Sequence, residues 1–362
     1  MFIFYLAIPT EVVYNGSQKA RRIDVKKGIA VAGTTVLDIL YPIQGFPRPG
    51  ELTNIVGEMS RSTGGCMCND IMDLAALDPD LPLTALGRVG NDEPGDFLLS
   101  RLRRFPNIDL AQIVRAGTTS FTLVMADEIS KQRSFYYCKG ASADFCEDDI
   151  RWDALDVDLL HIGYILLLDA LDAPDADYGT RLARLLHTAK KRGIRTSVDF
   201  VTEPGERTRR VAAPALKYAD YCVINESEAQ ALTGVRLVDD DAGGPLRENM
   251  PAALEAMKAM GVADWAVIHC PRGGFGMDEN GRYVEVPGLT LPRSYIKGSV
   301  GAGDAFCSGV LYAAWRGQSL REAIELGTAA AACSLSRPGA TEGMRSCAEA
   351  MALYRELMQN PT

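Results

Sequence analysis

The chain has 362 residues, of which 47% are hydrophobic and 23% are charged, and its formal net charge at pH 7 is −9. This length suits one large α/β domain or two smaller domains, and the composition is that of an ordinary globular protein. The negative charge argues against nucleic-acid binding through a basic face, and no stretch approaches the ~20 apolar residues of a membrane span.

Nine cysteines are scattered along the chain without a C-x-x-C pair. An odd number in this arrangement is typical of reduced thiols in a cytosolic protein. Cys66 and Cys68 form the only close pair, and their spacing suits neither an ordinary disulfide nor a zinc knuckle. We therefore expect a cytoplasmic protein and no metal at this pair.

The first 26 residues precede the first predicted core strand. Residues 1–8 are apolar but lack a basic n-region and a cleavage site, and Pro9 ends the run, so a signal peptide is not expected. We interpret residues 1–26 as an N-terminal extension and residues 27–362 as one domain.

The first half of the domain predicts a main sheet with a small lid. Residues 27–33 are an apolar run that ends in glycine, typical of a buried parallel strand, and Asp38 follows shortly after. Residues 42–60 are rich in proline, glycine and β-branched residues, and residues 117–140 contain two strand-like runs joined by a polar turn. These two segments predict a β-sheet lid, which would exclude water from a reaction beneath it.

A pair of glycines lies between these two segments. Gly64 and Gly65 come before Asn69 and before an amphipathic helix predicted at residues 71–77. Consecutive glycines allow the backbone to approach a ligand closely.

From residue 159 onward, strands and helices alternate strictly, which indicates a mostly parallel sheet with helices on both faces. Asn225 ends one strand, and Glu228 lies in the first turn of the next helix. The pair matches a capping box, which is a structural role, and its oxygens also suit Mg²⁺. Both interpretations stay open.

Two later segments have both a structural and a binding interpretation. Arg272, in a turn after a buried strand, could reach a phosphate or could simply face solvent. The Ala-rich helix predicted at residues 320–334 could lay Ala329, Ala330 and Cys333 against an adenine or against another helix.

The string G-S-V-G-A-G-D-A-F runs from Gly298 to Phe306 into a stretch that can be helical. Its backbone N–H groups would then point out of a helix N-terminus and could hold an anion. Asp304 would lie beside that anion, an unfavourable place for a carboxylate that only caps a helix. A general base for a hydroxyl group is the better explanation, although a bare G-A-G-D is equally compatible with a helix cap.

Taken in order, these motifs resemble those of the ribokinase-like (PfkB) carbohydrate kinases over about residues 28–345. The family's G-G-x-x-x-N, N-x-x-E and G-A-G-D-A-F-x-x-G patterns all occur here. The resemblance implies a ribokinase-like three-layer α/β/α sandwich with a central, mostly parallel sheet, a small β-sheet lid, and a homodimer formed through the lid. It also implies ATP-dependent transfer of the γ-phosphoryl group to a hydroxyl group, most often the primary alcohol of a small sugar.

The resemblance further assigns a role to each motif residue. Asp304 is the implied catalytic base, and its anion hole is formed by Gly301, Ala302 and Gly303. The implied sugar site comprises Asp38, Gly64, Gly65 and Asn69. The implied nucleotide site comprises Asn225, Arg272, Gly273, Ser299, Gly301 and Gly303. Mg²⁺ would be held through water by Asn225 and Glu228.

The sequence departs from the family pattern at two places. Gly298 and Ser299 replace an Asp and a Thr, and because that Asp helps to form a monovalent-cation site, we expect little potassium activation. The run from Cys66 to Cys68 replaces K-G-A and offers no ammonium group, so sugar choice should differ.

Two alternatives to a sugar kinase remain. A nucleoside acceptor is the alternative within the family. A non-catalytic regulatory protein that binds a sugar or a nucleotide is the alternative from another class, and the retained Asp304 argues against it.

Overall fold

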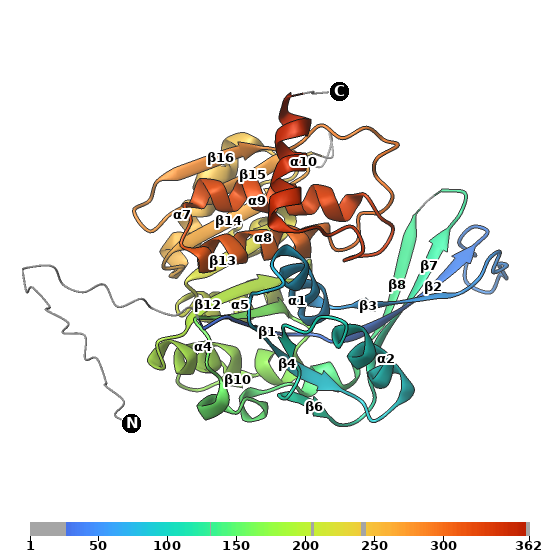
Figure 1. Cartoon of the computed structure of the whole chain (residues 1–362), viewed down its shortest axis with the longest axis horizontal. Helices are drawn as coiled ribbons and strands as arrows, with labels where there is room; N and C mark the ends of the chain where they lie inside the picture. Colours follow the sequence, from blue (N-terminus) through green and yellow to red (C-terminus); the bar gives the residue numbers. More distant parts are fainter. Residues whose placement is uncertain (1–26, 131, 204–205, 240–243, 360–362) are drawn as a thin grey trace, which may run out of the picture.

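The computed structural model describes residues 27–130, 132–203, 206–239 and 244–359, so the predicted extension at residues 1–26 lies outside the described residues. Its core is a ten-stranded sheet with the order β16-β15-β14-β13-β12-β9-β1-β4-β5, in which β6 also pairs with β4 (Figure 1). The strands are β1 (Ile29–Ala32), β4 (Leu83–Val89), β5 (Ile108–Asp109), β6 (Ile113–Arg115), β9 (Leu159–Ile165), β12 (Arg195–Phe200), β13 (Tyr221–Asn225), β14 (Trp265–Cys270), β15 (Gly273–Met277) and β16 (Tyr283–Pro287).

Neighbouring strands pair in parallel along the part of the sheet ordered β14-β13-β12-β9-β1-β4. The pairs β14-β15 and β15-β16 are antiparallel. Parallel pairing brings the carboxyl ends of β9, β12 and β13 to the same edge of the sheet. Ligands bind at this edge in open α/β sheets.

Helices cover both faces of the sheet. The core on one face includes α4 (Arg181–Lys191), α5 (Glu206–Leu216), α6 (Glu226–Thr233) and α7 (Met250–Met260). The core on the other face includes α1 (Cys66–Leu77), α8 (Ala302–Arg316) and α9 (Leu320–Leu335). The remaining α-helices are α2 (Glu93–Leu102), α3 (Asp169–Asp172) and α10 (Cys347–Gln359). The predicted three-layer sandwich with a mostly parallel sheet is confirmed.

A separate four-stranded sheet extends away from this body (Figure 1). We call it the small sheet, and its order is β3-β2-β7-β8. Its strands are β2 (Val36–Ile43), β3 (Ser60–Gly64), β7 (Ser120–Asp127) and β8 (Arg133–Cys138).

Two boundaries differ from the sequence-based expectation. The sequence predicts a loop and an edge strand within residues 42–60. The loop is present between β2 and β3, where Gly45, Pro47, Pro49 and Gly50 interrupt a regular strand, but the edge strand β3 begins only at Ser60. The helix predicted at 71–77 begins five residues earlier, so the residues from Cys66 to Asp70 are helical and buried.

No helix in the described part of the chain is both long enough and apolar enough to cross a bilayer. None of the nine cysteines forms a disulfide.

Candidate active site

Helix α8 begins with a tight glycine turn at the carboxyl edge of the sheet. Gly301 is its N-cap residue and has φ 78°, and a Cβ atom there would lie 2.6 Å from the Cβ of Ala340 and 2.7 Å from the Ala340 carbonyl oxygen. A side chain is therefore excluded by both the backbone conformation and the neighbouring chain. The next residues, Ala302 and Gly303, lie in the first turn of a 15-residue helix, where N–H groups lack intrahelical partners. This turn is the predicted anion cradle.

Asp304 follows this cradle and is only 4% exposed. Its Oδ2 atom accepts hydrogen bonds from Asn69 Nδ2 at 2.7 Å and from the Tyr164 hydroxyl at 3.1 Å. Burial raises the pKa of Asp304 to about 7, the negative charge of Asp70 adds to the rise, and the two hydrogen bonds oppose it. A carboxylate with a pKa near neutrality is suited to accept a proton at physiological pH.

Tyr164 is a site residue that the sequence did not indicate. It lies at the end of β9 with φ 57°, a left-handed conformation that is rare for an aromatic residue. Strain of this kind persists where the surrounding structure fixes it, and it is concentrated at functional sites. A motif search could not find it, because the only local signal is its position after Gly163 at a strand end.

Three carboxylates share one cavity of about 120 Å³ with Tyr164. Asp304 comes from α8, Asp199 from the end of β12, and Glu228 from the first turn of α6. Burial raises the pKa of Glu228 to about 7 and that of Asp199 well above its ordinary value, which the charges of Glu228 and Asp304 raise further. Such a group of carboxylates has an unfavourable electrostatic energy when all are ionised, and either a proton or a bound cation relieves it.

The capping role of Asn225 and Glu228 is present in full. The Asn225 side chain accepts a bond from the Glu228 N–H at 2.9 Å, and the Glu228 carboxylate accepts from the Asn225 N–H at 2.9 Å. Asn225 also lines the cavity of the three carboxylates. The structural and the binding interpretation are thus compatible.

The predicted sugar residues gather at the junction of the small sheet and α1. A Cβ at Gly64 would lie 2.2 Å from Asp38 Oδ2, so only glycine leaves room for that carboxylate. Burial raises the pKa of Asp38 to about 6, and a hydrogen bond from Thr122 opposes the shift. Asn69 links this region to Asp304. Gly65 instead shapes the backbone, since it is the N-cap of α1 with φ 82°.

The predicted nucleotide residues do not share one cavity: Asn225, Gly301 and Gly303 line that of the carboxylates, and Ser299 lines another, between the small sheet and the loop before α8. Gly273 lines a cavity of about 100 Å³ beside Phe306 and Thr328, whereas Arg272 is exposed and lines neither this cavity nor that of the carboxylates. On α9, the same cavity is lined by Thr328, Ala331, Ala332 and Leu335. Of the two interpretations given for Ala329, Ala330 and Cys333, helix packing agrees with the structure, because all three are fully buried and none lines this cavity.

A buried cluster lies beneath Asp304. The Cys66 thiol donates to Asp70 Oδ2 at 3.0 Å, and His161 Nε2 lies 3.0 Å from the same oxygen. His161 Nδ1 lies 3.0 Å from the Ser197 hydroxyl oxygen. These contacts use Asp70 Oδ2, whereas Asp70 Oδ1 is buried and has no hydrogen-bond partner among the described residues. The effect of the cluster on the site comes through the negative charge of Asp70 on Asp304.

The chain is similar in sequence to a known protein family. A model of the pfkB family of carbohydrate kinases matches residues 26–347. The chain is 24% identical over 319 residues to a ribokinase from Haemophilus influenzae, covering 87% of this chain and 94% of the relative. It is 23% identical over 322 residues to a 5-dehydro-2-deoxygluconokinase from Shouchella clausii, covering 86% of this chain and 91% of the relative.

Solved structures show the same fold. An Arabidopsis thaliana ribokinase complexed with ribose and ATP aligns with a TM-score of 0.74 at 19% identity, covering 91% of this chain and 99% of that one. A ribokinase from Thermotoga maritima aligns with a TM-score of 0.72 at 23% identity, covering 92% and 99%. The similarity thus extends over the main sheet and the small sheet together.

Proposed function

The chain belongs to the pfkB family of carbohydrate kinases, and from this premise we propose that it transfers the γ-phosphoryl group of ATP to a hydroxyl group of a small sugar, with Asp304 as the general base. The observation that carries this proposal is the buried Asp304 carboxylate, held by Asn69 and Tyr164 directly behind the glycine turn of α8. Such a carboxylate can take the proton of an attacking hydroxyl while the N–H groups of the turn stabilise the charge on the transferred group.

The acceptor would lie between the small sheet and α8. Asp38 and Asn69 bracket this space, and a carboxylate can accept hydrogen bonds from two neighbouring hydroxyl groups at once. Asn69 then has two functions, because its amide nitrogen orients Asp304 while its Oδ1 atom, which is buried and has no partner among the described residues, can accept a bond from the acceptor. The proposed primary alcohol would approach the free Oδ1 side of Asp304.

ATP would extend from the glycine turn toward the cavity at the β14–β15 turn. The apolar walls of that cavity, which include Leu289 and Ala332, suit a purine base. We place Gly273 and the N–H groups of Gly301 and Gly303 along this path. Arg272 lies off the path, as its guanidinium group packs near Gly244.

The donor set of the carboxylate cavity fits Mg²⁺, which prefers oxygen ligands and keeps several waters. Asp199, Asn225 and Glu228 would hold it, directly or through water. When bound, the ion would neutralise charge on the phosphate groups. Gly298 contributes no side-chain oxygen and packs against Pro338, so the loop before α8 adds no carboxylate for a monovalent cation.

Replacing Glu228 by glutamine tests the magnesium site. Glutamine also completes a capping box, so α6 should keep its N-terminus, while the charge that attracts the cation is lost. We expect the Mg²⁺ concentration for half-maximal rate to rise by about 10-fold, measured at fixed ATP. Glu226→Gln, which removes the neighbouring charge of α6, is the matched control and should change this value by less than about twofold. Equal effects of the two variants would contradict the assignment.

The activity should depend on pH through Asp304. Only the deprotonated carboxylate can accept a proton, and the pKa is about 7. We therefore expect kcat/KM for the acceptor to rise between about pH 6 and pH 8 and then to level off. In Tyr164→Phe, a donor that favours the charged carboxylate is lost, so the midpoint should move to higher pH. A midpoint that stays in place or moves lower would show that Tyr164 does not tune the base.

We also propose a homodimer formed through the small sheet. Apolar side chains are exposed on and beside it: Leu52 is 89% exposed, Ile55 58% and Tyr136 59%. Exposed apolar side chains gathered in one region indicate an interaction surface, and β3 and β8 are unpaired edges of the sheet. Sedimentation velocity of the purified chain, compared with Ile55→Glu, would detect the dimer and its loss.

A cytoplasmic location is the last part of this proposal. It is supported by nine cysteines without a disulfide, five of which are buried as free thiols. Fractionation of cells followed by detection of the chain would test it.

The overall function is tested by ADP release from purified protein with MgATP. The acceptors would be pentoses, hexoses, sugar acids, sugar phosphates and nucleosides. Turnover with a sugar of any of these classes supports the proposal, turnover with a nucleoside alone transfers the assignment to a nucleoside kinase, and binding without turnover favours a non-catalytic member.

A further inference from the structure

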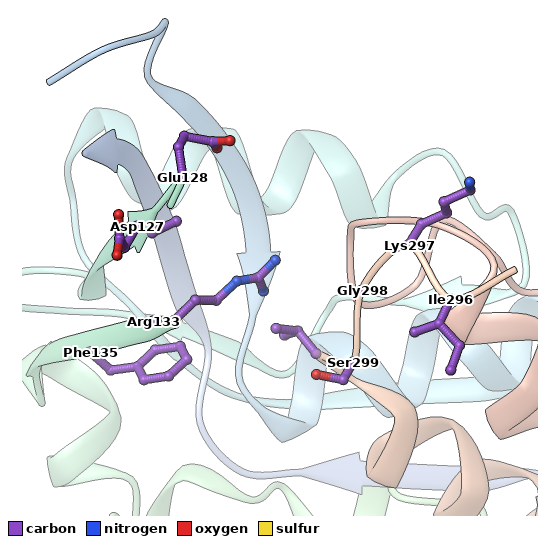
Figure 2. A pocket seen from close by; sticks show the side chains of 10 residues that line it. Asp127, Glu128, Arg133, Phe135, Ile296, Lys297, Gly298 and Ser299 are labelled. Atoms are coloured by element: carbon purple, nitrogen blue, oxygen red, sulfur yellow. The ribbon is translucent and has the colours of Figure 1, made fainter. Parts of the chain in front are cut away.

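A cavity of about 660 Å³ lies between the outer end of the small sheet and the loop before α8 (Figure 2). One wall comes from the ends of β7 and β8 with the turn between them. The other wall comes from residues 296–300, which lead directly into the glycine turn at Gly301. The cavity therefore adjoins the proposed site of phosphoryl transfer.

The strand register places this cavity on the acceptor side of the small sheet. Asp38 pairs with Thr122, and Thr122 pairs with Tyr137. Residues two and four positions further along β8 share that face, and these are Phe135 and Arg133. Moving outward from Asp38, the face thus changes from hydroxyl-binding groups to an aromatic ring and then to a guanidinium group. At ~3.3 Å per residue, Arg133 lies roughly 13 Å beyond Tyr137 along the strand.

The Arg133 guanidinium group has no direct partner among the described residues, although the carboxylates of Asp127 and Glu128 line the same cavity. Its side chain is half-buried. The nearby Asp127 carboxylate is already engaged, because it accepts bonds from the N–H groups of Gly45, Ile129 and Ser130. The hydrogen bond from the Ser130 hydroxyl, together with these N–H bonds, lowers the pKa of Asp127 to about 2.

The facing loop offers complementary groups. In Figure 2 the Arg133 side chain extends from β8 toward this loop, and the Ser299 hydroxyl points back into the cavity, while the Glu128 side chain points away from Ser299. Lys297 also lines the cavity and has a long, flexible side chain, although in this view its ammonium group points away from Arg133. Phe135 and Ile296, which are 58% and 43% exposed, supply an apolar floor.

We propose that Arg133, with Ser299, binds an anionic substituent on the acceptor, so that this kinase phosphorylates a sugar that already carries a carboxylate or a phosphate group. The proposal rests on the sugar-kinase function proposed above. A neutral monosaccharide held between Asp38 and Asp304 would leave Arg133 unused. An acceptor with a charged end can span both sites, with its reacting hydroxyl at Asp304, its body against Phe135 and its anion at the guanidinium fork.

The test compares related acceptors with and without an anionic group. The matched pairs are gluconate with glucose and fructose 6-phosphate with fructose, because each charged member keeps a free primary hydroxyl group. For at least one pair, kcat/KM of the charged member should exceed that of the neutral member by about 10-fold or more. Which pair responds separates a carboxylate from a phosphate.

Variants then connect this preference to Arg133. In Arg133→Gln, the ratio of kcat/KM for charged and neutral acceptors should fall by about 10- to 100-fold, mainly through KM of the charged acceptor. Arg133→Lys should recover part of the loss, because it restores the charge but not the planar fork. Arg48→Gln, which removes an exposed charge from the loop between β2 and β3, should leave the ratio unchanged.

Three results would overturn the proposal. The first is a wild type that uses the neutral member of every pair equally well, which would leave the sugar-kinase function intact. The second is an Arg133→Gln variant whose main defect is a higher KM for MgATP, which would assign the cavity to the nucleotide. The third is the absence of both turnover and calorimetric binding for all charged acceptors; if no acceptor of any class is turned over, the sugar-kinase function fails as well.

Discussion

Replacing Asp304 by asparagine is expected to lower turnover by about 10²- to 10⁴-fold, the usual effect of losing a general base. The amide has the same shape as the carboxylate and can still accept bonds from Asn69 and Tyr164, so the pocket should keep its geometry. Because the amide cannot take a proton, the loss should appear in kcat. Dissociation constants for the acceptor and MgATP, measured by calorimetry, should change by only a few-fold.

A matched control separates the loss of chemistry from the loss of a buried carboxylate. Asp220 is also buried and paired, with Lys190, but it lies at the start of β13, on the opposite edge of the sheet. Asp220→Asn should lower thermal stability at least as much as Asp304→Asn and leave kcat nearly unchanged. If Asp304→Asn kept wild-type turnover, the assignment of Asp304 as the base would be wrong.

The part of the site that could be predicted is the part with unusual backbone requirements. Gly64 must be glycine because Asp38 occupies the space of a Cβ, and Gly301 must be glycine because of its left-handed φ and the close approach of Ala340. Requirements of this kind leave fixed residue types at fixed spacings, which a sequence pattern can display. The same motifs also indicated the fold, because a parallel sheet brings the ends of successive strands to one edge.

The parts that could not be predicted depend on which way each side chain points in the folded chain. The Tyr164 hydroxyl contacts Asp304 because the backbone at the end of β9 has a strained conformation, and no residue type in the sequence indicates that conformation. On α9, small residues occur on every side of the helix, so the sequence could not show that Ala331 and Ala332 face the cavity while Ala329 is packed inside. In the sequence, Arg133 is only one basic residue beside a polar turn. The register of β8 shows that it lies on the same face of the small sheet as Asp38. Periodicity identifies helices and strands, but it does not identify the neighbour that each face meets.

The glycine turn can be tested separately from the base by Gly301→Ala. We expect turnover to fall by about 10²- to 10³-fold, because the added Cβ must displace the turn whose N–H groups stabilise the transferred phosphoryl group. Two of the three nearest atoms to that Cβ are main-chain atoms of Ala340. Removing the methyl group of Ala340 by adding Ala340→Gly to the Gly301→Ala variant should therefore fail to restore activity.

Gly317, at the other end of α8, provides the control for this substitution. It has φ 75°, close to the 78° of Gly301, but no atom in the described part of the chain lies within 4 Å of a Cβ placed there. Both alanine variants carry the same left-handed strain, which costs about 1–2 kcal/mol, so both should lose similar thermal stability from this source. Only Gly301→Ala also moves the anion cradle, so only it should lose turnover. Equal kcat values for the two variants would mean that the conformation of the turn, and with it the proposed anion hole, does not contribute to the transfer step.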